Sequence, residues 1–166
     1  MMAGLLNIGE MCALALHVLV ELAVLREIDP DGRVTVQELA GKLHASVHTL
    51  QKVTRRLIML EMVEGARGAR GGLRSAIDPG KVNMLRVVEG IEGRLWSNDC
   101  MFSKRVCPEG CKCVFDGVTG ALEKRIREYF TGTTLADLRD MAMLPANRDC
   151  LKGKDHGGGG TEGCAY

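Results

Sequence analysis

Four of the seven cysteines lie close together, and they are the residues whose type and spacing most clearly suggest chemistry. Cys100, Cys107, Cys111 and Cys113 fall in one stretch without hydrophobic periodicity. Thiolates are soft ligands that suit iron–sulfur clusters, zinc or copper(I). An irregular loop can bring them to one point, whereas regular helical spacing would spread them apart. The pattern therefore predicts a metal site in this loop.

Three alternatives compete with an iron–sulfur site. A structural zinc site has four cysteines available, but the single residue between Cys111 and Cys113 departs from the usual zinc spacing. A thiol–disulfide switch is the second alternative, since clustered thiols are candidates for oxidation. Inert cysteines are the third, and chance crowding of four argues against them. Metal is favoured, and spacing alone prefers iron–sulfur over zinc.

Composition bounds the class of protein. The chain has 166 residues, a net charge of +1, and 46% hydrophobic but 4% aromatic residues. This predicts one compact domain, or one small domain with an appendage, and excludes a wholly disordered chain. With 22 basic and 21 acidic residues the chain is not a globally basic binder, so any nucleic-acid argument depends on local charge. No nucleophile or acid–base constellation emerges, so we do not expect an enzyme.

The longest apolar run, residues 11–25, is interrupted by His17 and Glu21. It is shorter than the roughly 20 residues that a membrane-spanning helix needs. No basic residue precedes it, as a secretory signal would require. We therefore expect a cytoplasmic protein without a membrane partner, whose cysteines stay reduced.

The elements that position this chemistry begin with three helical patterns. Residues 8–26 predict a buried helix, with Cys12 as a small buried hydrophobe and His17 as a core histidine. Thr35 and Glu38 form a capping-box pattern that starts a short second helix. Ser46 is an N-cap for a third, over residues 46–60, whose apolar positions repeat every three or four residues. Two short helices in this order suggest a helix-turn-helix. The methionines, Met59 and Met62 among them, read as core filler.

A basic hairpin follows these helices. Residues 62–66 and 73–77 predict two strands around a glycine-rich tip that carries Arg67 and Arg70. Helix, helix and basic hairpin is the order of a winged helix. Between Lys42 and Arg74 seven basic residues oppose two acidic ones, Glu61 and Glu64. Charge alone is more typical of a solvated face, but charge, capping and hairpin together indicate a surface for phosphate.

We therefore predict a mainly α fold with a small β-hairpin wing. Helices are expected at residues 84–91, after Asn83, at 115–130, and at 134–143. The expected organisation is a winged helix-turn-helix domain at 1–95, a cysteine-rich cluster-binding loop at 96–114, a long dimerisation helix and short terminal helix at 115–143, and a flexible tail at 144–166.

Over about residues 5–143 the sequence resembles the family of bacterial winged-helix regulators that includes IscR, NsrR and CymR. The resemblance rests on these stretches: Gly9-Glu10, Val36-Gln37-Glu38-Leu39-Ala40, Thr49-Leu50-Gln51-Lys52, Arg67-Gly68 with Gly71-Gly72, Val88-Glu89-Gly90-Ile91-Glu92-Gly93, the cysteine loop, and Leu135-Ala136-Asp137-Leu138. It implies a homodimer in which the helix at 115–130 packs against its partner. It also implies a DNA-binding transcriptional regulator, most often a repressor.

The resemblance further implies a [2Fe–2S] or [4Fe–4S] cluster held by Cys100, Cys107 and Cys113, which match the three family cysteines. The fourth ligand varies in the family, and Glu10, Cys111 and Asp116 are all candidates. Glu10 from the other subunit is favoured. Two rival functions remain: a cluster-free regulator of the same fold that responds to thiol oxidation or a partner protein, and, less favoured because of the basic wing, an iron–sulfur carrier or scaffold.

For DNA, the hypothesis places the start of the 46–60 helix in the major groove of a pseudo-palindromic operator. The sequence departs from the family pattern at three positions: Arg70 replaces a glycine in the wing, Leu73 stands where an aromatic is common, and Gln51 stands where an acid is frequent. Because of Gln51, the target sequences of the family cannot be carried over. The expected DNA-binding residues are Ser46, His48, Thr49, Gln51 and Lys52 near the bases, and Arg55, Arg56, Arg67 and Arg70 on phosphates.

Overall fold

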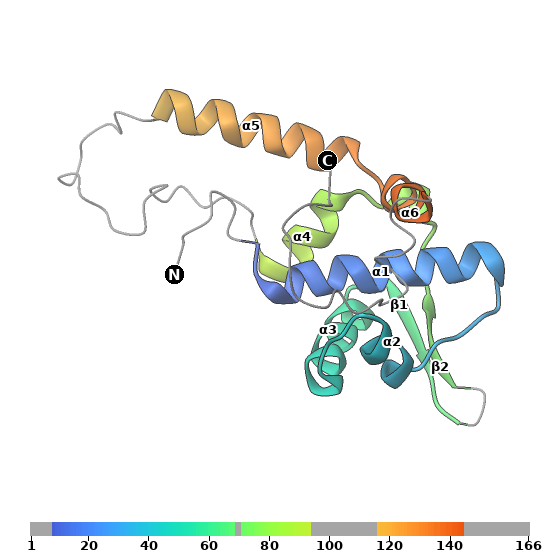
Figure 1. The fold of residues 1–166 in the computed structure, drawn as a ribbon. Helices are drawn as coiled ribbons and strands as arrows, with labels where there is room; N and C mark the ends of the chain where they lie inside the picture. Colours follow the sequence, from blue (N-terminus) through green and yellow to red (C-terminus); the bar gives the residue numbers. More distant parts are fainter. Residues whose placement is uncertain (1–7, 69–70, 94–115, 145–166) are drawn as a thin grey trace, which may run out of the picture.

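The computed structural model describes residues 8–68, 71–93 and 116–144, and its fold is mainly helical with one two-stranded antiparallel hairpin, as predicted. The cysteine loop, Arg70 and the tail beyond residue 144 lie outside the described residues. Figure 1 shows α1 crossing the molecule, with α2, α3 and the hairpin on one side and α5 on the other. The elements are α1 (Glu10–Ile28), α2 (Val36–Lys42), α3 (Val47–Met59), β1 (Val63–Ala66), β2 (Gly72–Ser75), the 3-10 turn η1 (Pro79–Lys81), α4 (Met84–Glu92), α5 (Asp116–Gly132) and α6 (Leu135–Met143).

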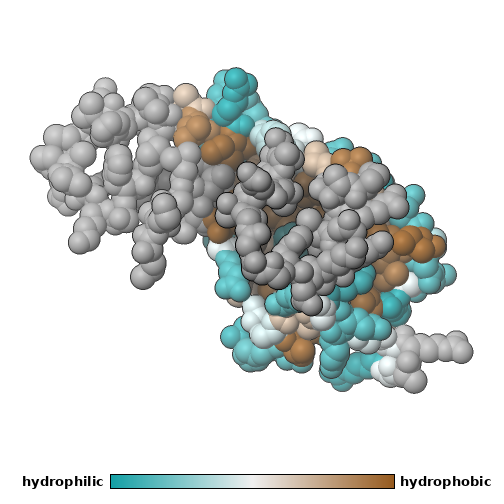
Figure 2. Space-filling view, viewed as in Figure 1, coloured by the Kyte–Doolittle hydropathy of each residue, from teal (hydrophilic) through white to brown (hydrophobic). Residues whose placement is uncertain are grey.

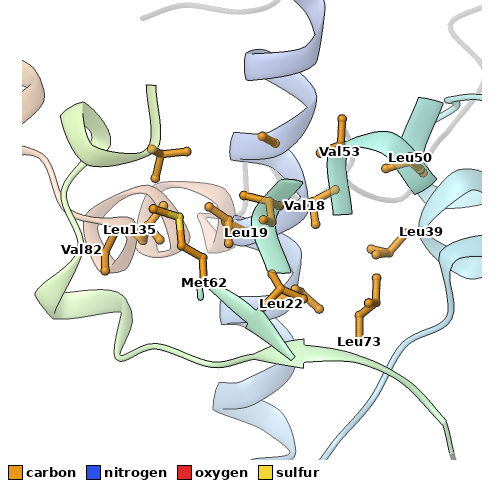
Figure 3. Packing of buried hydrophobic residues seen from close by; sticks show 14 of the residues in the cluster. Val18, Leu19, Leu22, Leu39, Leu50, Val53, Met62, Leu73, Val82 and Leu135 are labelled. Atoms are coloured by element: carbon orange, nitrogen blue, oxygen red, sulfur yellow. The ribbon is translucent and has the colours of Figure 1, made fainter. Parts of the chain in front are cut away.

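The hydrophobic core surrounds α1. Val18, Leu19 and Leu22 recur at helical spacing and are at most 1% exposed. Figure 3 shows them between Leu50 and Val53 of α3 on one side and Leu135 of α6 on the other. Burying each such aliphatic side chain stabilises the fold by roughly 1.5–3 kcal/mol. Because one core holds α1 and α3 together, the orientation of α3 depends on α1.

The first helix is shifted by two residues from the predicted 8–26. It starts at Glu10, after Gly9, whose carbonyl accepts from the amides of Cys12 and Ala13. It ends at Ile28 because Pro30 disfavours helical backbone at the preceding residue, and Asp29 is extended. The strands also differ from expectation, at Val63–Ala66 and Gly72–Ser75.

Two burial predictions were wrong. His17 is exposed rather than in the core, because it lies on a side of α1 that no other described element covers. Met59 is 69% exposed, since it falls at the end of α3 where the helix leaves the core. Cys12 and Met62 are buried, as predicted.

Backbone geometry explains the glycines of the hairpin. Gly68 has φ +103°, a conformation that other residues rarely adopt. At Gly71 a Cβ would stand 2.5 Å from the carbonyl oxygen of Ala66, so only glycine fits there. Leu73 also pairs with Val34 through two backbone hydrogen bonds of 3.0 and 2.8 Å. This bridge fixes the hairpin to the segment that leads into α2.

The two C-terminal helices pack in different places. In α6, Leu135 is buried in the main core, and its amide donates to the carbonyl of Val82 at 2.9 Å. In α5, Phe130 joins a second cluster with Cys12 of α1 and Val88 of α4. The rest of α5 extends away from the body in Figure 1.

The capping box of α2 gives a pH-dependent prediction. Hydrogen bonds from the Thr35 amide and hydroxyl to the Glu38 carboxylate lower the pKa of Glu38. A carboxyl with a depressed pKa stabilises the fold while ionised and loses this contribution as the pH falls through that pKa. We expect Glu38→Gln to unfold at a lower temperature than wild type at pH 7, and the difference to shrink as the pH falls below the ordinary pKa of a glutamate. Thermal unfolding followed by circular dichroism tests this; a difference that stays constant as the pH falls contradicts it.

Candidate nucleic-acid interface

A tight turn sets α2 against α3. After α2 ends, His44 adopts φ +48° and the amide of Ala45 donates to the carbonyl of Ala40 at 3.1 Å. Histidine is among the non-glycine residues that tolerate this left-handed conformation. Ser46 then starts α3, its hydroxyl accepting from the Thr49 amide at 3.0 Å. The pair of helices has the helix-turn-helix arrangement, although no glycine marks the turn.

Helix α3 has one buried and one polar face. Leu50, Val53 and Leu57 are 0% exposed and anchor it in the core. The opposite face projects outward from the N-cap onward. His48, Gln51, Lys52, Arg55 and Arg56 are exposed along it, as the sequence predicts. In Figure 2 the lower described surface, where α2, α3 and the hairpin lie, is mostly hydrophilic with a small apolar spot. Such a face offers hydrogen-bonding groups to the base edges of a groove.

Ser46 and Thr49 already have an intramolecular role. Besides the amide contact, their hydroxyl oxygens lie 2.7 Å apart. The Ser46 side chain therefore caps the helix, and the Thr49 hydroxyl is hydrogen-bonded to that cap, at the end of the helix that the sequence expects to contact DNA. Each hydroxyl keeps further hydrogen-bonding capacity, because a hydroxyl carries one donor and two acceptor sites.

Several of the basic residues between positions 42 and 74 already have partners inside the chain. Lys42 pairs with the buried carboxylate of Glu21 at 2.8 Å. Arg74 pairs across the hairpin with Glu64, at 2.6 Å, so its charge is locally balanced. Neither ion pair was predicted from the sequence, where Lys42 and Arg74 counted toward the basic surface. The only signal for the first was a lone acid inside the apolar run of the first helix.

Arg56 is directed toward α4. Its Nε and Nη2 donate to the backbone carbonyl of Gly90 at 3.1 and 3.0 Å. The side chains of Lys52, Arg55 and Arg67, in contrast, have no hydrogen bond or ion pair with another described residue. Of the basic residues expected to contact DNA, these three have a charge that is available to an external ligand, Lys52 near the bases and Arg55 and Arg67 on phosphates; Arg70 lies outside the described residues.

The predicted metal ligands are only partly within the described structure. Cys100, Cys107, Cys111 and Cys113 lie outside it, and so does the side chain of Asp116. Glu10 is exposed in the first turn of α1. Among the described residues no three metal-binding side chains gather at one point.

The start of α1 and the end of α4 are in direct contact. The Gly9 amide donates to the Glu92 carboxylate at 3.0 Å, so Glu10 lies beside the point where segment 94–115 leaves α4. Cys12, one turn further on, is enclosed, and burial followed by the charge of Glu92 raises the pKa of its thiol to about 11. Cys12 therefore stays a neutral packing residue at physiological pH, while Glu10 is accessible.

The comparison with protein families identifies the chain. Residues 8–141 match the profile of the family Rrf2, described as iron-dependent transcriptional regulators. The chain belongs to the Rrf2 family. This match includes α1 to α4, α5 and most of α6. Members are transcriptional regulators, and the resemblance inferred from the sequence is confirmed.

Individual Rrf2 relatives agree with this assignment. A protein of Aquifex aeolicus named as an HTH-type transcriptional regulator is 29% identical over 138 residues, 80% of this chain and 94% of that one. BadM of Rhodopseudomonas palustris, named likewise, is 35% identical over 80 residues. That alignment covers 48% of this chain and 47% of BadM, so the chain spans about half the length of this relative.

Solved structures show the same fold. CymR of B. subtilis, described as its global cysteine regulator, has a TM-score of 0.68 at 21% identity, covering 82% of this chain and 98% of CymR. IscR of T. potens has a TM-score of 0.63 at 20% identity, covering 82% and 88%. Both likenesses confirm the winged-helix architecture. None of the described helices is long and apolar enough to cross a membrane.

Proposed function

We propose that this Rrf2 protein is a homodimeric repressor that binds a pseudo-palindromic operator with an affinity controlled by an iron–sulfur cluster at the cysteine loop. The observation that supports DNA binding is the exposed polar face of α3. This helix is anchored in the core by the fully buried Leu50 and Leu57, and it adjoins the hairpin that carries Arg67. The family description as iron-dependent supports the metal part.

The described residues fall into two groups, those that contact bases and those that contact phosphates. His48, Gln51 and Lys52 lie nearest the N-terminal end of α3, where glutamine can bond adenine and lysine can donate to guanine. Arg55 on α3 and Arg67 on the wing, with Arg70 beyond the described residues, hold phosphates and fix the register. Ser46 and Thr49 keep the end of the helix in shape while retaining capacity for a backbone contact.

Helix α5 is the proposed dimer contact. Its Tyr129 is 63% exposed, whereas the adjacent Phe130 is buried against α1 and α4. The helix therefore has one side fixed to its own chain and one apolar ring facing outward. Figure 1 shows that α5 lies on the opposite side of α1 from α3, so a dimer through α5 leaves the DNA-binding surface free.

The donor set of the chain fits an iron–sulfur cluster. Cys100, Cys107 and Cys113 would hold it, and Glu10, Cys111 or Asp116 would supply a further ligand. Glu10 is an accessible carboxylate with no hydrogen bond or ion pair to another described residue, beside the start of the segment that carries the cysteines. A cluster with three thiolates and one oxygen ligand supplies a centre sensitive to oxygen or nitric oxide. Helix α1 connects this site to the DNA-binding helix, because α1 begins at Glu10 and shares a hydrophobic core with α3.

A cluster-free regulator is the second candidate, because the fold of CymR, described as a cysteine regulator, is as close as that of IscR. In that case the same cysteines would respond as thiols, or a partner protein would bring the signal. An iron–sulfur carrier is less favoured, since a carrier would not need the exposed face of α3.

One experiment separates these functions. The full chain is purified without oxygen, and iron, sulfide and zinc are measured per chain together with the visible spectrum. The protein, with and without metal, then selects duplexes from a random-sequence pool. We expect iron and sulfide together, and enrichment of an inverted repeat. Zinc without sulfide would exclude the cluster, and iron without sequence enrichment would favour the carrier.

The phosphate contacts give a quantitative prediction. Each phosphate contact contributes about 0.9 to the slope of log affinity against log salt. We expect Arg55→Ala and Arg67→Ala each to lower that slope by about this amount and to weaken binding to all sequences alike. Arg86→Ala, an exposed arginine near the start of α4 and outside the proposed DNA and dimer contacts, is the matched control and should leave the slope unchanged. Fluorescence anisotropy across a salt series measures this; equal slopes in all four proteins would contradict it.

A further inference from the structure

The geometry points to Arg56 as a positioning residue for sequence-specific binding, one that orients α3 through the carbonyl of Gly90 rather than by holding a phosphate. This inference rests on the proposed DNA-binding function. Arg56 lies next to Arg55 on the same helix, and sequence alone gives the two the same role. The structure separates them, because the described part of the chain gives a partner only to Arg56.

The contact with Gly90 is bidentate. Nε and Nη2 of Arg56 converge on one oxygen at 3.1 and 3.0 Å, across 34 residues of sequence. The fixed fork of a guanidinium can make this arrangement, whereas a lysine ammonium is a single point charge. The carbonyl belongs to the last turn of α4, where backbone oxygens lack partners within the helix and carry partial negative charge.

Packing beside the hydrogen bonds strengthens the same junction. A Cβ on Gly90 would stand 2.8 Å from Cδ1 of Leu60, the C-cap of α3, so the Leu60 side chain packs directly against the backbone of Gly90. Arg56 and Leu60 are one helical turn apart. The end of α3 is thus held on α4 by a polar and an apolar contact.

Helix α4 is in turn tied to α5. Glu89, the residue before Gly90, pairs with Arg127 of α5 at 3.2 Å. Two adjacent residues of α4 therefore contact different helices: Gly90 contacts α3, and Glu89 contacts α5. If α5 forms the dimer contact, the Arg56–Gly90 junction lies on the path that sets how the two α3 helices of a dimer are placed relative to each other. Spacing between half-sites is a geometric requirement of such dimers.

A positioning role and a phosphate role make opposite predictions for the charge-conserving variant Arg56→Lys. Lysine can replace arginine at a phosphate contact as a point charge, but it cannot make the bidentate bond to Gly90. Misplacing α3 affects contacts with bases. Electrostatic binding to unrelated DNA needs only the positive charge.

The test compares Arg56→Lys with Arg55→Lys, its matched neighbour, using the full chain. Anisotropy measures affinity for the duplex selected by the wild type and for a scrambled duplex of equal composition. We expect Arg56→Lys to weaken binding to the selected duplex about tenfold, or about 1.4 kcal/mol, with unchanged affinity for the scrambled duplex and unchanged salt slope. Arg55→Lys should stay within about twofold on both.

Each other outcome is decisive. If Arg56→Lys binds the selected duplex like wild type, while Arg56→Ala loses affinity for both duplexes and about 0.9 in salt slope, Arg56 is a phosphate contact and the inference is wrong. If Arg56→Lys weakens both duplexes equally and lowers the unfolding temperature, its role is merely structural and the inference is again wrong. If the wild type enriches no sequence at all, the proposed function itself fails, whatever Arg56 does.

Discussion

Cys107→Ala is expected to lose most of the iron and sulfide of the anaerobically purified protein, and to bind the selected operator as metal-stripped wild type does. Removal of one of three thiolate ligands leaves too few soft donors to hold the cluster. A regulatory coupling of about 1–3 kcal/mol corresponds to a change of about 5–150-fold in operator affinity between metal-loaded and metal-free protein. Metal analysis and anisotropy on the same samples measure both quantities.

Cys150→Ala is the control for this variant, because that cysteine lies well separated in sequence from the cluster of four. It should keep wild-type metal content and affinity. If Cys107→Ala retained both its iron and the operator affinity of loaded wild type, the cluster-controlled function would be wrong. A change in affinity without any bound metal in the wild type would instead support the thiol-responsive alternative.

Leu57→Ala is expected to lower the free energy of unfolding by about 2–5 kcal/mol, a large share of the stability of a domain of this size. Leu57 is 0% exposed in the main core, on the inner side of α3. Its truncation removes apolar burial and leaves a cavity between α3 and the elements packed on it. Urea denaturation followed by circular dichroism measures the loss.

The adjacent residue gives the matched control. Ile58 is 42% exposed, so Ile58→Ala loses a similar number of methyl groups from a site that water already reaches. We expect it to cost about 1 kcal/mol or less. Equal losses for the two variants would show that α3 is not anchored through this face, and the burial assigned to Leu57 would have to be rejected.

Much of the fold could be predicted from local signals. The capping boxes at Thr35 and at Thr134, and the cap at Asn83, each involve a side chain and a backbone amide three residues away. Such signals survive in a single sequence, because both partners lie within one helical turn. Boundaries were less accurate: α1 is shifted by two residues, since Gly9 provides no side-chain cap to mark its start.

Burial was predictable where periodicity is clear and not where coverage decides. Leu50 and Val53 repeat at helical spacing and are buried, whereas His17 belongs to a helix that is apolar on nearly every side. Which side of such a helix stays open depends on where the other helices pack. The position of α6 against α1, and not with α5, was likewise set by Leu135 and its hydrogen bond to Val82.

By itself, the sequence determined the winged-helix order, the polar face of α3 and the set of candidate cysteine ligands, because each of these is written in residues close together along the chain. Only the tertiary structure decided which positive charges remain available. Lys42, Arg56 and Arg74 have partners 21, 34 and 10 residues away. Such contacts form only when helices and strands pack together, so the spacing of residues along the chain does not predict them.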